Sequence, residues 1–136
     1  EISAKSEQQT IHDLEKLSGQ KSLLVIKNYL GGEYFLTVDE VHFLPDNTIQ
    51  LVEAKNTTDP SKFFTSLLDI KDAIFKMILL TNLKNVFVDG VEYNHVSVVK
   101  LTSTQMFDFS KLNENKQEFY QKLIFEGKVN NFEVVT

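Results

Sequence analysis

The sequence predicts an α/β fold in which a mixed β-sheet is flanked by helices, in the order α-β-β-β-α-β-β-α. Two observations predict this fold. Two apolar runs separated by a tight turn form a hairpin signal, and a long apolar helix separates this hairpin from further strand-like runs. Hairpin strands run antiparallel, whereas strands joined through a helix run parallel, so both kinds of pair are expected in one sheet. The 136 residues suffice for a single domain with a buried core.

Apolar periodicity defines each element, and turn residues separate the elements. Ile11, Leu14 and Leu17 recur at helical spacing, and Gly19 follows them as a stop signal. Turns are expected at Gly31-Gly32, at 45–48 and at Asp89-Gly90. The predicted elements are a helix over 6–17, strands over 21–29, 34–44 and 48–55, a helix over 61–80, strands over 85–89 and 96–101, a helix over 113–125 and an edge strand over 132–135.

The helix predicted over 61–80 has a broad apolar face, which we expect to be buried against the sheet. Asp59-Pro60-Ser61 suits its start, with proline in the first turn. Lys71 and Lys76 are expected to mark its solvent side. The apolar residues are Phe63, Phe64, Leu67, Leu68, Ile70, Ile74, Phe75, Met77, Ile78 and Leu79.

Composition restricts the classes of partner. The net charge is −5 and all 14 basic residues are lysine, which argues against binding driven by phosphate charge alone. No apolar run approaches the roughly 20 residues of a membrane span. The absence of cysteine excludes disulfides and thiolate metal sites and fits the reducing cytoplasm. The first residue is not methionine, which leaves open that the chain is a fragment of a longer protein.

The hairpin carries the residues that are candidates for a functional site. Strand side chains alternate between faces, so Glu53 and Lys55 are expected to point the same way. If Asp46-Asn47 is a two-residue loop, Glu40 faces Glu53 and Val38 faces Lys55. One bulge would bring Asp39 to Glu53 in place of Glu40, so the spacing leaves both acids open.

Two carboxylates at close range repel each other unless a cation lies between them. Asp39 or Glu40 together with Glu53 would suit Mg²⁺, which binds carboxylates, water and substrate phosphate; Mn²⁺ can substitute. Lys55 could then orient the attacking water or stabilise charge in the transition state. These are the parts needed to hydrolyse a phosphodiester. The plainer alternative is a solvated ion pair at a strand end.

An acid on one strand, a turn, and Glu53-Ala54-Lys55 at the end of the next strand resemble the PD-(D/E)xK nuclease superfamily. The resemblance covers roughly 6–101. It implies a restriction-endonuclease-like core of helix, three strands, helix and strand. The sequence around 52–57, followed by the helix containing 69–79, looks most like type II restriction endonucleases. Members of this group cut double-stranded DNA with Mg²⁺, and several use a glutamate on the first helix, which Glu7 or Glu15 could match.

Three functions follow as expectations from the resemblance. The first is a Mg²⁺-dependent endodeoxyribonuclease, working as a homodimer or with an additional DNA-recognition domain. The second is an inactive DNA-binding or assembly module of the same fold, and the third is a junction-resolving or repair nuclease. Thr57, Thr58 and Lys62, just beyond Lys55, are the expected DNA-backbone contacts. His12, His42 and His95 lack metal-ligand spacing and are expected to be structural.

Overall fold

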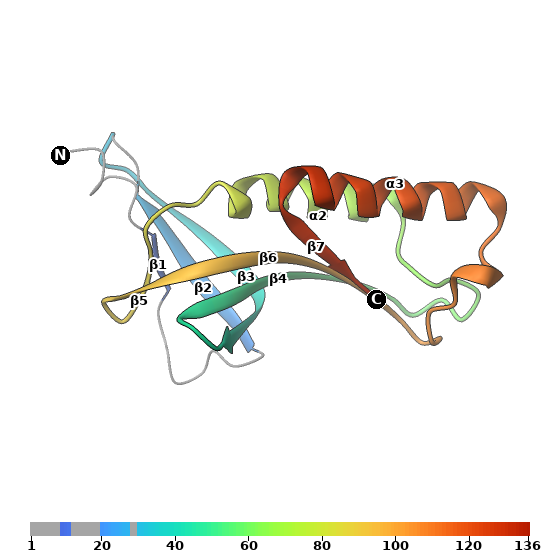
Figure 1. Ribbon diagram of the computed structural model, residues 1–136, viewed down its shortest axis with the longest axis horizontal. Helices are drawn as coiled ribbons and strands as arrows, with labels where there is room; N and C mark the ends of the chain where they lie inside the picture. The colour runs from blue at the N-terminus through green and yellow to red at the C-terminus, as the bar shows by residue number, and fades with distance from the viewer. Residues whose placement is uncertain (1–8, 12–19, 28–29) are drawn as a thin grey trace. The chain divides into compact units, whose positions relative to one another are not determined.

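The computed structural model describes residues 9–11, 20–27 and 30–136 (Figure 1). It is a mixed α/β protein, which confirms the predicted class. In chain order the elements are β1 (Gln9–Ile11), β2 (Gln20–Lys27), β3 (Glu33–Leu44), β4 (Thr48–Thr57), α2 (Leu67–Thr81), β5 (Val86–Val88), β6 (Val91–Ser103), the 3₁₀ turn η2 (Phe109–Lys111), α3 (Glu114–Asn130) and β7 (Phe132–Val135).

The strands form a mixed sheet in the order β4-β3-β2-β1-β5-β6-β7, and β4 also pairs with β6. β2 and β3 are antiparallel, whereas β6 and β7 are parallel. Asn94 N donates to Asn47 O at 2.9 Å, and Thr102 Oγ1 donates to Asn56 Oδ1 at 2.8 Å. These contacts follow the same order along β4 and β6, as in a parallel pair. The predicted crossover through a helix therefore corresponds to α2.

The contacts within the chain cluster into two compact units, each described here by itself. Unit 1 comprises the described residues up to Val52 together with Asn82–Val96. Its core is aliphatic and comes mainly from β2, β3, β4 and β5. The buried side chains include Leu24, Val38, Val41, Ile49, Leu51, Val86 and Val88. Unit 2 comprises Glu53–Thr81 and Ser97–Thr136, and thus holds α2, α3 and β7.

The β3–β4 turn is one residue longer than predicted. Leu44 pairs with Thr48, so the loop contains three residues and Pro45 does not pair in the ladder. Proline has no N–H to donate there, and Asp46 and Asn47 adopt positive φ angles of 63° and 52°. The register consequently shifts by one residue.

This shift makes one prediction wrong, because Glu40 pairs with Val52 and not with Glu53. A bulge also interrupts β3 at this point: Ser22 pairs with Val38 but Gln20 pairs with Val41. The extra residue lies at Asp39-Glu40, and it explains why Val38 and Val41, three residues apart, are both buried. The bulge weighed as an alternative from the sequence is therefore present in β3, relative to β2.

The prediction of a helix over 6–17 is wrong for the residues of this range that the structure describes. Gln9–Ile11 form a strand, β1, which pairs antiparallel with β2 and parallel with β5. Pairing on both sides outweighs the helical spacing of the apolar residues. Glu7 and Glu15, the candidate helix acids, lie outside the described residues.

α2 begins six residues later than predicted. The chain first forms a turn in which Asp59 accepts hydrogen bonds from the backbone N–H and the hydroxyl of Ser61, at 2.9 and 2.7 Å. Ser66 then caps the helix, because its Oγ accepts from Asp69 N at 3.3 Å and its carbonyl accepts from Ile70 N at 3.1 Å. The start of the helix is thus decided by a serine cap rather than by the proline.

The buried face of α2 is narrower than the sequence suggests. It consists of Ile70, Ala73, Met77 and Leu80, a stripe at three- and four-residue spacing. Half of the residues predicted to be buried on this helix are exposed instead. They are Leu67, Leu68, Phe75, Ile78 and Leu79, which are 41–77% exposed.

α3 and β7 complete unit 2; α3 begins within one residue of its predicted start but ends five residues beyond the predicted 113–125. Asn113 caps α3 by accepting from Lys116 N at 2.9 Å, and Asn131 ends it in the left-handed conformation. The chain then turns directly into β7, the edge strand expected at 132–135. Gly127 lies against β7 so closely that a Cβ there would be 2.6 Å from Phe132 O. Only glycine permits this approach of helix and strand.

Candidate functional site

Glu53 and Lys55 lie at the end of β4, where the sequence placed its candidate site. Glu53 is only 7% exposed. Lys55 Nζ is 3.7 Å from Glu53 Oε2, so the two side chains lie on the same side of the strand as expected. Because Glu53 is buried, the alternative of a solvated ion pair is wrong for this carboxylate. A buried carboxylate requires partners that compensate its charge.

The principal partner of Glu53 is Lys76, which was predicted to lie on the solvent side of its helix. Lys76 on α2 donates to Glu53 Oε1 at 2.9 Å, and its side chain is only 17% exposed. It therefore faces inward, whereas Lys71 on the same helix is exposed as predicted. Helical spacing could have predicted this inward orientation. Lys76 follows Ala73 by three residues and precedes Leu80 by four, which puts it on the buried stripe.

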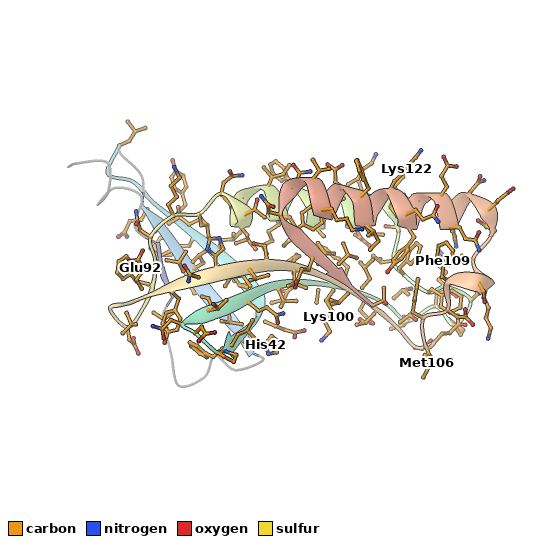
Figure 2. All side chains as sticks on the ribbon, in the orientation of Figure 1. His42, Glu92, Lys100, Met106, Phe109 and Lys122 are labelled. Atoms are coloured by element: carbon orange, nitrogen blue, oxygen red, sulfur yellow. The ribbon has the colours of Figure 1, made fainter. Side chains whose placement is uncertain are left out.

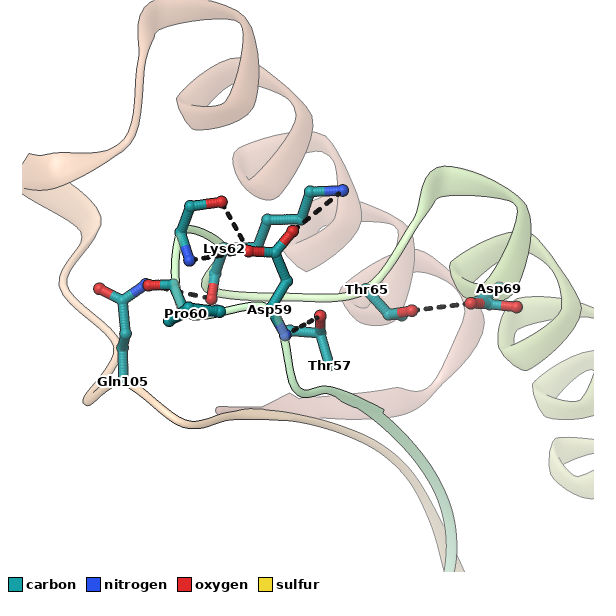
Figure 3. A network of polar contacts seen from close by, with 8 residues as sticks. Thr57, Asp59, Pro60, Lys62, Thr65, Asp69 and Gln105 are labelled. Atoms are coloured by element: carbon teal, nitrogen blue, oxygen red, sulfur yellow. Dashed lines mark hydrogen bonds and ion pairs between the residues drawn. The ribbon is translucent and has the colours of Figure 1, made fainter.

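A second carboxylate, Asp69, lies near Lys55 at the start of α2. Thr65 Oγ1 donates to Asp69 Oδ2 at 2.7 Å (Figure 3). This hydrogen bond, helped by Ser66 and by the positive charge of Lys55, lowers the pKa of Asp69 below its usual value. Lys55 therefore interacts electrostatically with two carboxylates, Glu53 and Asp69, and Asp69 was not among the residues predicted for the site.

In unit 1, β3 carries the two candidate acids, Asp39 and Glu40. The carboxylate of Glu40 lies 2.9 Å from His42 Nε2, two residues along the same strand. Both are half-buried, and Figure 2 marks His42 on this hairpin. Asp39 is half-buried as well. The structure thus brings Glu40 to a histidine, a contact that alternation along the strand already implied.

The expected DNA-backbone residues lie in or beside the loop between β4 and α2 (Figure 3). Thr57 Oγ1 accepts from Asp59 N at 3.3 Å, and Lys62 Nζ is 3.9 Å from Asp59 Oδ2. Gln105 Nε2 donates to the carbonyl of Pro60, which fastens the loop to the segment after β6. Hydrogen bonds from Ser61 and then the charges of Lys62 and Lys116 lower the pKa of Asp59. Thr58 is exposed.

A pocket of about 300 Å³ opens in unit 2 at the start of α2. Phe64 and Phe119 form part of its lining, with ring centroids 6.1 Å apart. Lys62 and Lys116 also line it, so the pocket combines aromatic surface with two cations. Such a combination can accept an anionic group next to an apolar one.

The residues that the structure describes contain no group of three or more His, Asp or Glu side chains that could hold a metal ion. A site built from one or two carboxylates is smaller than such a group, so this finding does not speak against Glu53 as one ligand. Within the same described part of the chain, no helix is long and apolar enough to cross a membrane. Compared with known proteins, the chain matches no family model, no curated protein and no solved structure.

Proposed function

We propose that this chain is a Mg²⁺-dependent endodeoxyribonuclease domain that resembles the PD-(D/E)xK restriction endonucleases and cuts double-stranded DNA in the cytoplasm. The observation that carries the proposal is the end of β4, where a buried glutamate and a lysine two residues later lie on one side of the strand. The order β2, β3, β4 and α2, followed by β5 and β6, supports it, because the superfamily core likewise has three strands and a helix before its next strand. The helix that begins the superfamily core is not matched at Gln9–Ile11, which form β1.

The residue types fit the metal that the proposal implies. Mg²⁺ is commonly bound through one or two carboxylates, with waters and substrate phosphate oxygens completing the shell. Glu53 would supply one carboxylate, and the second carboxylate expected from the sequence is Asp39 or Glu40; Mn²⁺ would serve in place of Mg²⁺. The expected pairing no longer favours Glu40, because Glu40 pairs with Val52. When bound, the metal would make a water more acidic and stabilise charge on phosphate.

In this proposal Lys55 is the cationic side chain that acts on the attacking water and the phosphate. Its ammonium group lies 3.7 Å from Glu53 Oε2 at the end of β4, and its positive charge helps to lower the pKa of Asp69. From there it can orient the attacking water and stabilise the negative charge that develops on the phosphate oxygens. The water oxygen would bond to phosphorus, the bond from phosphorus to one deoxyribose oxygen would break, and that oxygen would leave as a hydroxyl carrying the proton lost by the water. Glu7 stays a candidate helper from the sequence alone.

DNA binding is proposed for Thr57, Thr58 and Lys62, with Lys116 beside them at the pocket. Asp59 lies among these groups and offsets part of their positive charge. A net charge of −5 also weakens attraction to DNA. We therefore propose that sequence reading comes from a second copy of the chain or from an additional recognition domain.

A cleavage assay tests the function. Purified protein is incubated with supercoiled plasmid and Mg²⁺, and nicked and linear products are quantified. We expect Lys55→Ala to abolish cleavage, while Lys122→Ala, at a 74% exposed position on α3 (Figure 2), retains it. Full cleavage by Lys55→Ala would refute the site. A panel of duplex, flap and junction DNA then separates restriction-like cutting from junction-resolving or repair activity.

One observation favours a second candidate, an inactive DNA-binding or assembly module. Both oxygens of Glu53 already face ammonium groups, those of Lys76 and Lys55. A carboxylate compensated in this way is stable without any metal. The second candidate predicts DNA binding with no cleavage by wild-type protein and no calorimetric signal with Mg²⁺ or Mn²⁺.

A further inference from the structure

Lys76 occupies an unusual position for a lysine. It lies on the buried stripe of α2, and its ammonium donates to Glu53 Oε1 at 2.9 Å with 17% of its side chain exposed. Lysines are seldom buried to this extent unless they are paired. Each of the two buried charges therefore depends on the other for compensation.

The pair also determines what else can approach Glu53. Lys55 Nζ is 3.7 Å from the other carboxylate oxygen, so one negative charge is shared by two positive ones. A divalent cation that approaches Glu53 meets two like charges, and the nearer of them occupies a carboxylate oxygen. Repulsion between like charges in a poorly hydrated site is strong. A cation can therefore bind Glu53 well only after an ammonium group has moved.

We propose that Lys76 is an internal counter-cation for Glu53, which it occupies in the metal-free protein and releases when a divalent cation binds. The inference rests on the proposed nuclease function. A lysine suits this role because its charge is compact and its four-carbon stem is flexible, so the ammonium can withdraw without moving α2. Lys76 acts through Glu53 and is accordingly a positioning residue.

The test compares Mn²⁺ binding by calorimetry in wild-type protein, Lys76→Gln and Lys71→Gln. Glutamine keeps a hydrogen-bond donor for Glu53 but removes the charge, and Lys71 is an exposed lysine on the same helix. Lys76→Gln should bind Mn²⁺ at least about tenfold more tightly than wild type. Lys71→Gln should bind as wild type does. A purely structural lysine would give the opposite result, because its loss would loosen Glu53 and weaken the site.

The outcomes separate this inference from the nuclease proposal. If wild type binds Mn²⁺ and cuts DNA while Lys76→Gln binds equally or less tightly, the inference is overturned and the nuclease stands. If only Lys76→Gln binds Mn²⁺, the metal does not release Lys76 in the natural protein, so the inference is overturned and the metal-dependent nuclease is refuted with it. If neither protein binds Mn²⁺, both are refuted.

A second measurement needs no variant, in case Lys76→Gln does not fold. Wild-type protein is labelled with an amine-reactive reagent with and without saturating Mn²⁺, and modification of each lysine is quantified by mass spectrometry. Release from Glu53 should raise the labelling of Lys76 severalfold and leave Lys71 unchanged. Equal labelling of Lys76 in both conditions overturns the inference.

Discussion

Lys76 donates a 2.9 Å hydrogen bond to Glu53 across 23 residues of chain, from α2 to the end of β4. Both side chains are largely buried, at 17% and 9% exposure, and they belong to the same compact unit. The pair therefore ties the helix to the strand that carries the candidate site. Its energetic role can be measured separately from any catalytic role.

Removing one partner of this pair should destabilise the protein. In Lys76→Met, Glu53 loses its nearer cation and keeps Lys55 at 3.7 Å, and we expect a loss of about 3 kcal/mol in the free energy of unfolding. The double variant Glu53→Gln with Lys76→Met should lose less than the sum of the single variants. Urea unfolding measures all three, with Lys71→Met as the exposed control. Additive losses would mean that the pair contributes no coupling energy.

Substitutions at Asn47 test the three-residue loop of the hairpin, because this residue has a φ of 52°. A β-branched residue is strained in this region, so Asn47→Val should lose about 1–2 kcal/mol of stability. Asn47→Gly should be close to neutral, because glycine adopts this conformation freely. Thermal unfolding of both variants measures the difference in their stability. Equal stability of the two would contradict the observed turn geometry.

Gly127 tests the contact between α3 and β7. Helix propensity alone predicts that Gly127→Ala gains up to about 1 kcal/mol. Because the added Cβ would lie 2.6 Å from Phe132 O, we expect instead a net loss of about 1–3 kcal/mol. Lys128→Ala, at the next and exposed position, should change little. Chemical denaturation compares the two, and a stabilised Gly127→Ala would be incompatible with this close approach.

Acid should destabilise the fold through carboxylates whose pKa is lowered in the folded state. Hydrogen bonds from Thr65 lower the pKa of Asp69, and those from Ser110 lower the pKa of Asp108, both from 3.8. The unfolded state therefore binds protons more readily than the folded state. At pH values well above 3.8, these groups make their full contribution to the stability of the fold. Their contribution is lost as the pH falls below 3.8 through the folded-state values.

The measurement is the melting temperature between pH 2 and pH 6. Ser110→Ala removes the hydroxyl that donates to Asp108 at 2.7 Å, so its melting temperature should fall less steeply with acid than that of wild type. The two profiles should run parallel above about pH 5, where aspartate is ionised in both states. An unchanged slope in Ser110→Ala would show that Asp108 is not responsible.

Several features were determined by the sequence itself because they depend on neighbours along the chain. Alternation along a strand put Glu53 and Lys55 on one side, and it put Glu40 beside His42. Local turn residues located the break at Asp89-Gly90, where both residues have positive φ. The edge strand after α3 also follows from local pattern. These periodicities hold whatever the rest of the chain does.

Other features were decided only by tertiary structure. Gln9–Ile11 became a strand because β2 and β5 offer hydrogen-bonding edges that no local pattern reveals. The turn length and the bulge at Asp39-Glu40 shifted the register by single residues, and a shift of one residue reverses every side chain. Lys76 faces Glu53 because the buried carboxylate requires a counter-charge from a distant segment. Periodicity sets which residues share a face, but burial and charge compensation across the fold decide what that face meets.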